Sequence, residues 1–245
     1  MRFSGKVALV TGAAVGIGRA TVLKLLSEDA RVIAWDLNAD ALARLQEETG
    51  AKEGALMTMA CDVSDEEAVT RAAAEAKKRF GRIDILVNNA ALWRDCGSFL
   101  DTTAETWKQY LNVNVMGVVY CTRAVLRDMV DAGYGRIINV SSVAGVYGNA
   151  KMAHYSATKG AVISLTRALA KEVTEKGVLV NCVSPGSVSP SDEADVNYTQ
   201  ESALSFMGRT GRDMENANLI CFLASDEASY VAGENIMIDG CRKKM

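Results

Sequence analysis

The sequence has few prolines, a single histidine and no paired cysteine motif. Only 2 of its 245 residues are proline, and no segment rich in Pro, Gly or Ser divides the chain. Because 49% of the residues are hydrophobic, the chain can bury one large core, and a single domain over residues 1–245 is expected. The six cysteines form no Cys-x-x-Cys pair, which favours reduced thiols over disulfides or a metal site.

A membrane-length hydrophobic run and a block of like charges are also lacking. The net charge is −3, so the composition gives no basis for a nucleic acid or an anionic membrane as partner. The basic residues at 242–244 are interpreted as a short solvated tail. Residues 1–6 precede the first apolar run without a secretory core or cleavage site, and we therefore expect a cytoplasmic location.

A glycine-rich turn follows the first apolar run. Residues 7–10 are apolar, Thr11 to Gly18 read TGAAVGIG, and a helical pattern extends to about residue 28. Glycines in such a strand, turn and helix let the backbone approach a pyrophosphate, and the helix N-terminus attracts its charge. The alternative is a glycine-rich turn that binds nothing.

The second apolar run, residues 31–35, ends in Asp36. This carboxylate stands 18 residues after Gly18, close to the offset of about 20 for an acid that binds the adenosine ribose hydroxyls. Asn38 can cap the following helix, so capping does not require the aspartate. A carboxylate here repels a 2′-phosphate, and neither Leu37 nor Val15 supplies a cation. The sequence therefore predicts NAD rather than NADP as cofactor.

Tyr155, Lys159 and Ser142 form the candidate catalytic group. A tyrosine titrates near pH ~10 and needs an adjacent positive charge before it can act as a base near neutral pH. On a helix, the i,i+4 offset puts Lys159 on the same face as Tyr155. Ser142, thirteen residues before the tyrosine, can hydrogen-bond the same substrate oxygen, and this spacing favours it over Ser141. The alternative is a pair of solvated neighbours on a helix surface.

His154 is a competing acid or base, because it is the only histidine and precedes the tyrosine. Adjacent side chains on a helix point about 100° apart, so His154 and Tyr155 do not share a face. We interpret this histidine as a residue of the pocket wall or the surface.

Strand and helix patterns alternate along the chain. Strands are predicted near residues 7–11, 31–36, 55–61, 83–88, 135–141, 179–184 and 235–238. This alternation favours an α/β fold of the Rossmann type, doubly wound, with a mainly seven-stranded parallel sheet and helices on both faces. Ser64 and Glu67 form a capping-box pattern that predicts the start of the third helix.

These features resemble the single-domain subgroup of the short-chain dehydrogenase/reductase family, over essentially the whole chain. The matching residues are Thr11-Gly-x-x-x-Gly-x-Gly18, Asp62-Val63, Asn88-Asn89-Ala90, Asn114, Ser142, Tyr155-x-x-x-Lys159 and Pro185-Gly186. The resemblance implies a catalytic set of Asn114, Ser142, Tyr155 and Lys159. It implies that NAD is contacted by Gly12, Gly16, Ile17, Gly18, Asp36, Asp62, Val63, Asn89, Tyr155, Lys159 and Val188.

The same resemblance also implies a separate role for each of these residues. The glycines and Ile17 would hold the pyrophosphate, Asp62 and Val63 the adenine, Asn89 the adenosine-side backbone and Lys159 the nicotinamide ribose. Asn114 would hold a water that links Lys159 to solvent.

Three residues depart from the family pattern. Ala91 stands in place of a glycine after Asn-Asn-Ala, and Asp29 replaces the glycine that commonly ends the first helix. Pro190 stands where relatives carry a threonine that meets the nicotinamide carboxamide, and Ser189 or Ser191 is the candidate replacement.

Substrate specificity is predicted from the loops. The pocket is expected at residues 92–96 and 143–152, and residues 187–206 are expected to form an acidic lid. The Gly148-Asn149 stretch resembles the β-ketoacyl carrier-protein reductases, but those typically prefer NADPH and dock an acidic carrier through basic residues. This chain has Asp131-Ala132-Gly133-Tyr134 there.

We therefore favour an NAD-linked enzyme that oxidises a secondary alcohol or reduces the ketone, with a hydroxysteroid, polyol or similar substrate. The reductase of acyl carriers is the alternative, and a non-catalytic NAD-binding redox sensor is the alternative from another class. Self-association as a homotetramer or dimer is implied by the resemblance, through helices near 103–131 and 156–175. The second of these carries small residues at Gly160, Ala161, Ser164 and Ala168.

Overall fold

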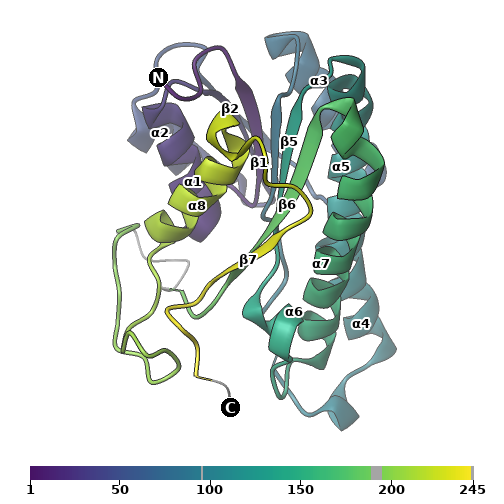
Figure 1. Cartoon of the computed structure of the whole chain (residues 1–245), viewed down its shortest axis with the longest axis vertical. Helices are drawn as coiled ribbons and strands as arrows, with labels where there is room; N and C mark the ends of the chain where they lie inside the picture. The colour runs from purple at the N-terminus through teal and green to yellow at the C-terminus, as the bar shows by residue number, and fades with distance from the viewer. Residues whose placement is uncertain (95, 189–194, 244–245) are drawn as a thin grey trace.

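A parallel sheet of seven strands forms the centre of the molecule (Figure 1). The computed structural model describes residues 1–94, 96–188 and 195–243. The strands lie in the order β3-β2-β1-β4-β5-β6-β7, and every neighbouring pair is parallel. They are β1 (Val7–Thr11), β2 (Arg31–Asp36), β3 (Leu56–Ala60), β4 (Ile85–Asn88), β5 (Gly135–Val140), β6 (Val178–Pro185) and β7 (Asn235–Ile238). The predicted sheet is confirmed.

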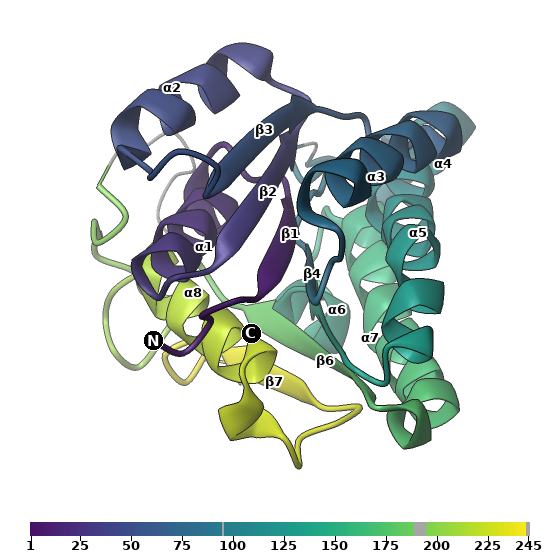
Figure 2. The ribbon, with the colours of Figure 1, turned by 90° about the horizontal axis from the view of Figure 1, so that it is seen from above.

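Helices cover both faces of this sheet (Figure 2). One face carries α1 (Gly16–Ser27), α2 (Ala39–Thr49) and α8 (Asp213–Ala224). The other carries α3 (Glu66–Phe80), α4 (Ala104–Leu111), α5 (Gly117–Asp131) and α7 (Ala153–Val173). The short elements are α6 (Val143–Tyr147), the 3₁₀ turns η1 (Phe99–Asp101), η3 (Thr174–Lys176) and η4 (Asp226–Ala228), and the π-helical turn η2 (Asn112–Met116). The fold is therefore the Rossmann-type, doubly wound α/β arrangement that the sequence predicts.

Two hydrophobic cores lie on opposite sides of the sheet. Val22 and Leu25 of α1 pack with Ile220 of α8 in one core, and Phe80 of α3 packs with Val125 of α5 in the other. Every residue of β1, β5 and β6 is buried. Strands covered on both faces read as continuous apolar runs, which is why the sequence pattern located them.

The strand order reverses beside β1. The chain passes outward from β1 to β2 and β3, and then returns to the other side of β1 with β4. In an open parallel sheet, ligands bind in the crevice outside the carboxyl ends of the strands at this point. The glycine turn after β1, Asn88 at the end of β4 and Ser142 after β5 all follow carboxyl ends at this edge.

The predicted capping box of the third helix is wrong. The N-cap of α3 is Asp65, whose carboxylate accepts from the amides of Glu67 and Ala68. Ser64 instead donates its hydroxyl to Asp62 at 2.7 Å. Asn38 caps α2 as expected, accepting from the amide of Ala41.

The residues after β7 pair with the predicted lid. Ser205 and Arg242 form an antiparallel bridge, and the amides of Phe206 and Lys243 donate to the carbonyls of Cys241 and Leu204. We call this pairing of residues 204–207 with 240–243 the tail ribbon. It corrects the interpretation of a solvated tail for Arg242, which is only partly exposed, whereas Lys243 is exposed as expected and Lys244 lies outside the described residues. Figure 1 shows the C-terminus at the same end of the molecule as α6.

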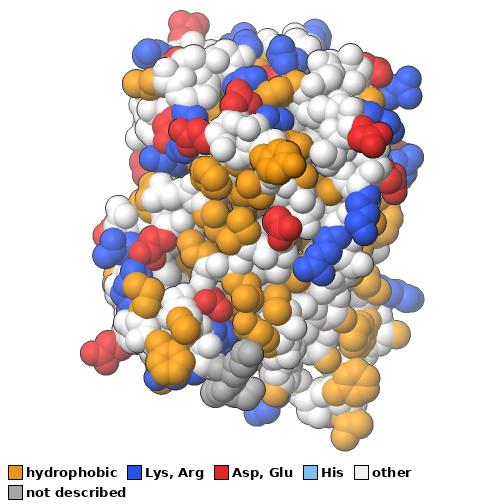
Figure 3. Space-filling model, in the orientation of Figure 1, with side chains coloured by type: hydrophobic (Ala, Val, Ile, Leu, Met, Phe, Trp, Pro, Cys, Tyr) orange, Lys and Arg blue, Asp and Glu red, His pale blue; other side chains and the backbone are white. Residues whose placement is uncertain are grey.

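Apolar side chains gather on one face of the surface. Figure 3 shows them over α8 and β7, and the exposed apolar residues include Phe222 of α8 and Met237 of β7. Among the described residues, no helix combines the length and the apolar character that a membrane span requires.

Candidate active site

Helix α7 places Tyr155 and Lys159 on one face, as the i,i+4 offset predicts. The Lys159 Nζ lies 5.8 Å from the centre of the Tyr155 ring. This lysine is 3% exposed, and its Nζ donates to the backbone carbonyl of Val140 at the end of β5 at 2.7 Å. Burial lowers the pKa of Lys159 to about 8. The charge is therefore held at the sheet edge beside the tyrosine.

Ser142 and Tyr110 lie near the Tyr155 hydroxyl. Burial raises the pKa of Tyr155, the interaction with the Ser142 side chain lowers it, and Tyr110 raises it. Desolvation has the largest of these effects and opposes the ionised form of the phenol. The depression of this pKa by Lys159 stays a prediction.

The two adjacent serines have different partners. Ser141 is buried and its hydroxyl donates to the backbone carbonyl of Lys159 at 2.7 Å. Ser142 is partly exposed and caps α6, where its Oγ accepts from the amide of Ala144 at 3.1 Å. Ser141 therefore ties β5 to α7, and Ser142 is the hydroxyl that faces Tyr155.

Asn114 lies in the π-helical turn η2 and is fully buried. Its Oδ1 accepts from the amide of Leu92 at 2.7 Å, and its Nδ2 donates to the Leu92 carbonyl and to Thr158 at 2.9 and 3.1 Å. These bonds hold Leu92, at the start of the loop expected to line the substrate pocket, close to Thr158 of α7. Among the described residues no hydrogen bond joins Asn114 to Lys159, so the water link implied by the resemblance stays a prediction.

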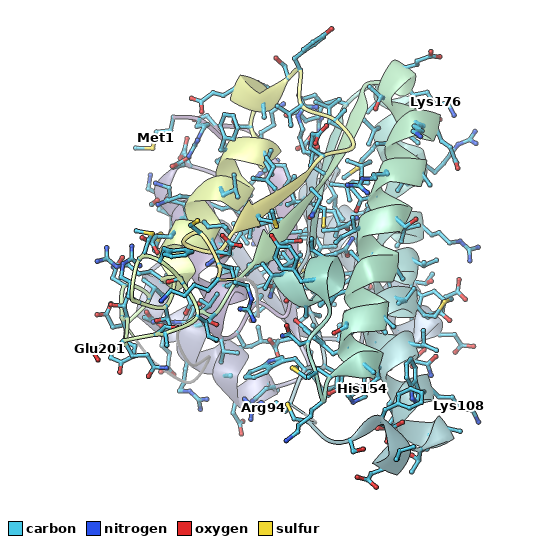
Figure 4. The ribbon with its side chains drawn as sticks, turned by 60° about the horizontal axis from the view of Figure 1, so that its bottom comes forward. Met1, Arg94, Lys108, His154, Lys176 and Glu201 are labelled. Atoms are coloured by element: carbon cyan, nitrogen blue, oxygen red, sulfur yellow. The ribbon has the colours of Figure 1, made fainter. Side chains whose placement is uncertain are left out.

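His154 packs against aromatic side chains of α4. Its ring is 2% exposed and stacks on Tyr110 with centroids 4.0 Å apart, with Trp107 at 6.1 Å. Both aromatic residues belong to α4, and Figure 4 shows His154 at the first turn of α7 beside that helix. A surface position is therefore wrong, and the histidine packs in the interior between α4 and α7.

The glycine turn after β1 fits a pyrophosphate. Gly12 and Gly16 have φ of 60° and 55°, and a Cβ on Gly18 would lie 1.9 Å from the carbonyl oxygen of Gly12. Helix α1, which includes Ile17, has no side-chain cap at Val15 and no acid in its first turn. No side chain at the N-cap thus occupies its first amides, which suits the binding of an anion there.

Thr11 and Asn89 support this turn. The Asn89 Nδ2 donates to the carbonyls of Thr11 and Gly12 at 3.1 and 2.9 Å. The Thr11 Oγ1 accepts from the amides of Asn89 and Ala90, both at 3.1 Å. Sequence reasoning gave Thr11 no role. Its position directly before the first glycine is the signal that was available.

Asp36 stands beside the glycine turn at the end of β2. One carboxylate oxygen accepts from the amide of Ala14 and the other from the amide of Asn38, both at 3.0 Å. Leu37 and Val15 are exposed next to it, at 73% and 42%. Within the described residues no cation pairs with Asp36, so the carboxylate is fixed and its charge is not neutralised by a side chain.

The remaining predicted cofactor residues lie at the same edge of the sheet. Asp62 is exposed and accepts from the amide of Ser64 at 2.9 Å, whereas Val63 is buried against Gly117 of α5. Val188 pairs with Gly211 in an isolated parallel bridge. Ser189, Pro190 and Ser191 lie outside the described residues.

A glycine turn at the first βα junction, with an acidic residue at the end of the second strand, characterises the dinucleotide-binding proteins of the Rossmann type. The family model described as short chain dehydrogenase matches residues 6–201. The chain therefore belongs to the short-chain dehydrogenase family, and its relatives support an oxidoreductase acting on hydroxyl or keto groups.

Several curated relatives match almost the full chain. The 3-oxoacyl-[acyl-carrier-protein] reductase FabG of Thermotoga maritima is 41% identical over 98% of both chains. The FabG protein of Escherichia coli is 36% identical over 98% of both chains. The 2-dehydro-3-deoxy-L-rhamnonate dehydrogenase (NAD(+)) of a Sphingomonas strain is 35% identical over 98% of this chain and 96% of its own.

Proposed function

We propose that this protein is an NAD-dependent dehydrogenase that interconverts a secondary alcohol and its ketone, with Tyr155 as acid and base. The observation that carries the proposal is the position of the buried Lys159 on the Tyr155 face of α7, with its Nζ 5.8 Å from the centre of the tyrosine ring and with Ser142 near the phenol. A phenol, a hydroxyl and an ammonium group lie near one another there. They suit proton transfer, hydrogen bonding to the substrate oxygen and stabilisation of the phenolate, respectively.

In the reductive direction Tyr155 gives its proton to the carbonyl oxygen as that oxygen becomes a hydroxyl. Ser142 donates a hydrogen bond to the same oxygen, an effect worth about 2–4 kcal/mol at comparable oxyanion donors. Lys159 stabilises the phenolate that remains, because its positive charge lies beside the ring. Oxidation runs these steps in reverse. A bound nicotinamide supplies the hydride donor or acceptor and, when oxidised, the additional positive charge.

The NAD preference rests on Asp36. Its carboxylate is held by two backbone amides at the end of β2, where a 2′-phosphate would meet an unneutralised negative charge. The name of the Sphingomonas relative also includes NAD⁺. Initial rates with NADH and NADPH at matched concentrations test this preference, and a better catalytic efficiency with NADPH would overturn it.

A hydroxysteroid, polyol or similar carbinol is the proposed substrate, and a 3-oxoacyl carrier-protein reductase is the second candidate. The 41% identical relative favours the second. The end of α5 weighs against it, because Arg127 is paired with Asp131 at 3.1 Å and no basic residue follows before Gly135. NADH absorbance during incubation with alcohols, ketones and a 3-oxoacyl thioester separates the two.

A redox sensor is the remaining alternative. A sensor needs only the dinucleotide site, whereas this chain also has the Ser142, Tyr155 and Lys159 group. Tight NAD binding without turnover across the whole panel would favour the sensor and contradict the enzyme.

Self-association and a cytoplasmic location complete the proposal. Ala161, Ser164 and Ala168 of α7 are exposed, so this stripe of small residues does not pack on the chain's own sheet. It supports close packing against a second copy in a homotetramer or dimer. Light scattering in solution tests this, and a strict monomer would contradict it.

A further inference from the structure

The tail ribbon fixes Arg242 beside the candidate active site. The ribbon is held by amide bonds from Phe206 to Cys241 and from Lys243 to Leu204, at 3.0 and 2.9 Å. Between them, Arg242 is bridged to Ser205. The strand that leads into the ribbon is also anchored, because the Tyr147 hydroxyl of α6 contacts the Met237 sulfur of β7 at 3.2 Å. The backbone at Arg242 is thus held by the hydrogen bonds of the ribbon and by the contact between α6 and the preceding strand β7.

The Arg242 side chain reaches the loop between α6 and α7. Its guanidinium lies 3.5 Å from the Asn149 Oδ1. The amide of Asn149 in turn donates to the Ser156 hydroxyl at 3.1 Å, and Ser156 directly follows Tyr155 on the first turn of α7. One neutral residue therefore links the guanidinium to the helix turn that carries the proposed acid and base.

The charge of Arg242 is not matched by a carboxylate. Arg209, in the same part of the fold, is paired with both oxygens of Glu215 at 3.0 and 2.7 Å. Arg242 forms no such pair among the described residues, where its guanidinium has one long hydrogen bond, to the neutral Asn149. Lys243, the next residue of the ribbon, also forms no ion pair with a described residue. A guanidinium has five donors in a planar fork that matches a carboxylate.

Two described acidic residues near the ribbon accept hydrogen bonds from backbone amides. Asp195 is exposed, and its Oδ1 accepts from the amide of Asn197 at 2.9 Å within its own turn. Asp239, before the ribbon, accepts from the amide of Cys241 at 3.0 Å. Neither of these two carboxylates is an ion-pair partner of Arg242 among the described residues.

We propose that Arg242 binds a carboxylate of the substrate, so that the substrate class is a hydroxy acid and its oxo acid. This inference rests on the proposed dehydrogenase function. The carbinol carbon meets Tyr155, and the acid group, at the other end of the molecule, meets the guanidinium. A charge-assisted bidentate contact of this kind favours an acid over its neutral ester by about tenfold or more in kcat/KM.

The test uses matched acid and ester pairs as probes. Short 3-oxo acids and sugar acids, each beside its methyl ester, are assayed with NADH or NAD⁺ on the intact protein. The variants are Arg242→Gln, Arg242→Lys and, as a control on the adjacent residue of the same ribbon, Lys243→Gln. We expect the original chain to prefer the acids, and Arg242→Gln to raise KM for the acids at least about tenfold, far more than for the esters.

The outcomes separate the two proposals. Arg242→Lys should keep part of the acid preference, and Lys243→Gln should keep all of it, which excludes a general effect of positive charge on the tail. Equal use of acids and esters by the original chain, or an equal loss on both in Arg242→Gln, would overturn the role of Arg242 alone. Failure to turn over any acid, ester, alcohol or ketone would instead contradict the dehydrogenase function.

Discussion

The Lys159 Nζ lies 2.7 Å from the carbonyl oxygen of Val140, so the buried positive charge of α7 is bonded to the end of β5. This contact orients the lysine along the sheet edge and leaves its charge beside the Tyr155 ring. Burial makes the charge costly, because the group loses its water and gains only one neutral acceptor.

Replacing Lys159 by Met should remove activity without destabilising the fold at neutral pH. We expect kcat to fall at least about a hundredfold, because the phenolate of Tyr155 loses its positive neighbour. The variant should match or exceed the original chain in free energy of unfolding at pH 7. Denaturant melts and steady-state kinetics measure the two effects.

The same replacement has a defined pH dependence. Burial lowers the pKa of Lys159 from 10.5 to about 8, so between these values the unfolded chain binds more protons than the folded one. The lysine's penalty is therefore full below pH 8 and fades as the pH rises toward 10.5. The stability advantage of Lys159→Met should shrink between pH 8 and 10, and an advantage that grows over this range would contradict the buried charge.

Tyr155→Phe should abolish turnover and leave NAD binding intact. The substitution removes only the hydroxyl, and the ring keeps its partly buried position on the first turn of α7. NADH binding is measured by fluorescence titration and turnover by NADH absorbance. Retained activity at even a tenth of normal would refute the proton-transfer role.

Asp36→Asn should move cofactor preference toward NADPH by about tenfold or more, because the repulsion of the 2′-phosphate disappears. The amide oxygen can still accept one of the two backbone bonds that Asp36 accepts from Ala14 and Asn38. Asp40→Asn, an exposed acid in the first turn of α2, is the matched control and should leave the ratio unchanged. Equal ratios in both variants would show that Asp36 does not select the cofactor.

Gly18→Ala should weaken NADH binding and lower the unfolding temperature, because the new Cβ would lie 1.9 Å from the Gly12 carbonyl oxygen. Overpacking of this kind costs about 1–3 kcal/mol, and each kcal/mol lowers Tm by about 2–4 °C in a chain of this size. Gly97→Ala is the control, because its Cβ would meet nothing within 4 Å. Thermal melts with and without NADH measure both effects. An unchanged Gly18→Ala would show that the turn can widen.

The fold was predictable because its main signal is repeated along the chain. β1 and β6 are buried from end to end, so their apolar runs stand out between helical patterns. The order of motifs then located the turn at Gly12 and the face shared by Tyr155 and Lys159. Local choices were less predictable. Ser64 and Asp65 both suit a helix cap, and only the bond from Ser64 to Asp62 removes the serine from that role.

Properties that depend on distant segments could not be read from the sequence. The raised pKa of Tyr155 follows from burial by residues far away in the chain. The basic residues near the C-terminus look like a solvated tail, and only the pairing of Arg242 with Ser205 brings its guanidinium to Asn149. The spacing of motifs along the sequence does not predict such contacts between the last residues and the middle of the chain.

The position of β1 in the sheet separates two tasks along the chain. Asp36, the residue proposed to select the dinucleotide, ends β2 on one side of β1. Ser142 and Tyr155 follow β5 on the other side. Exchange of residues 31–60 with a homologue of opposite coenzyme choice should therefore transfer that choice and leave the carbinol chemistry untouched. Residues 31–60 can thus change the choice of dinucleotide during evolution while the catalytic residues stay the same.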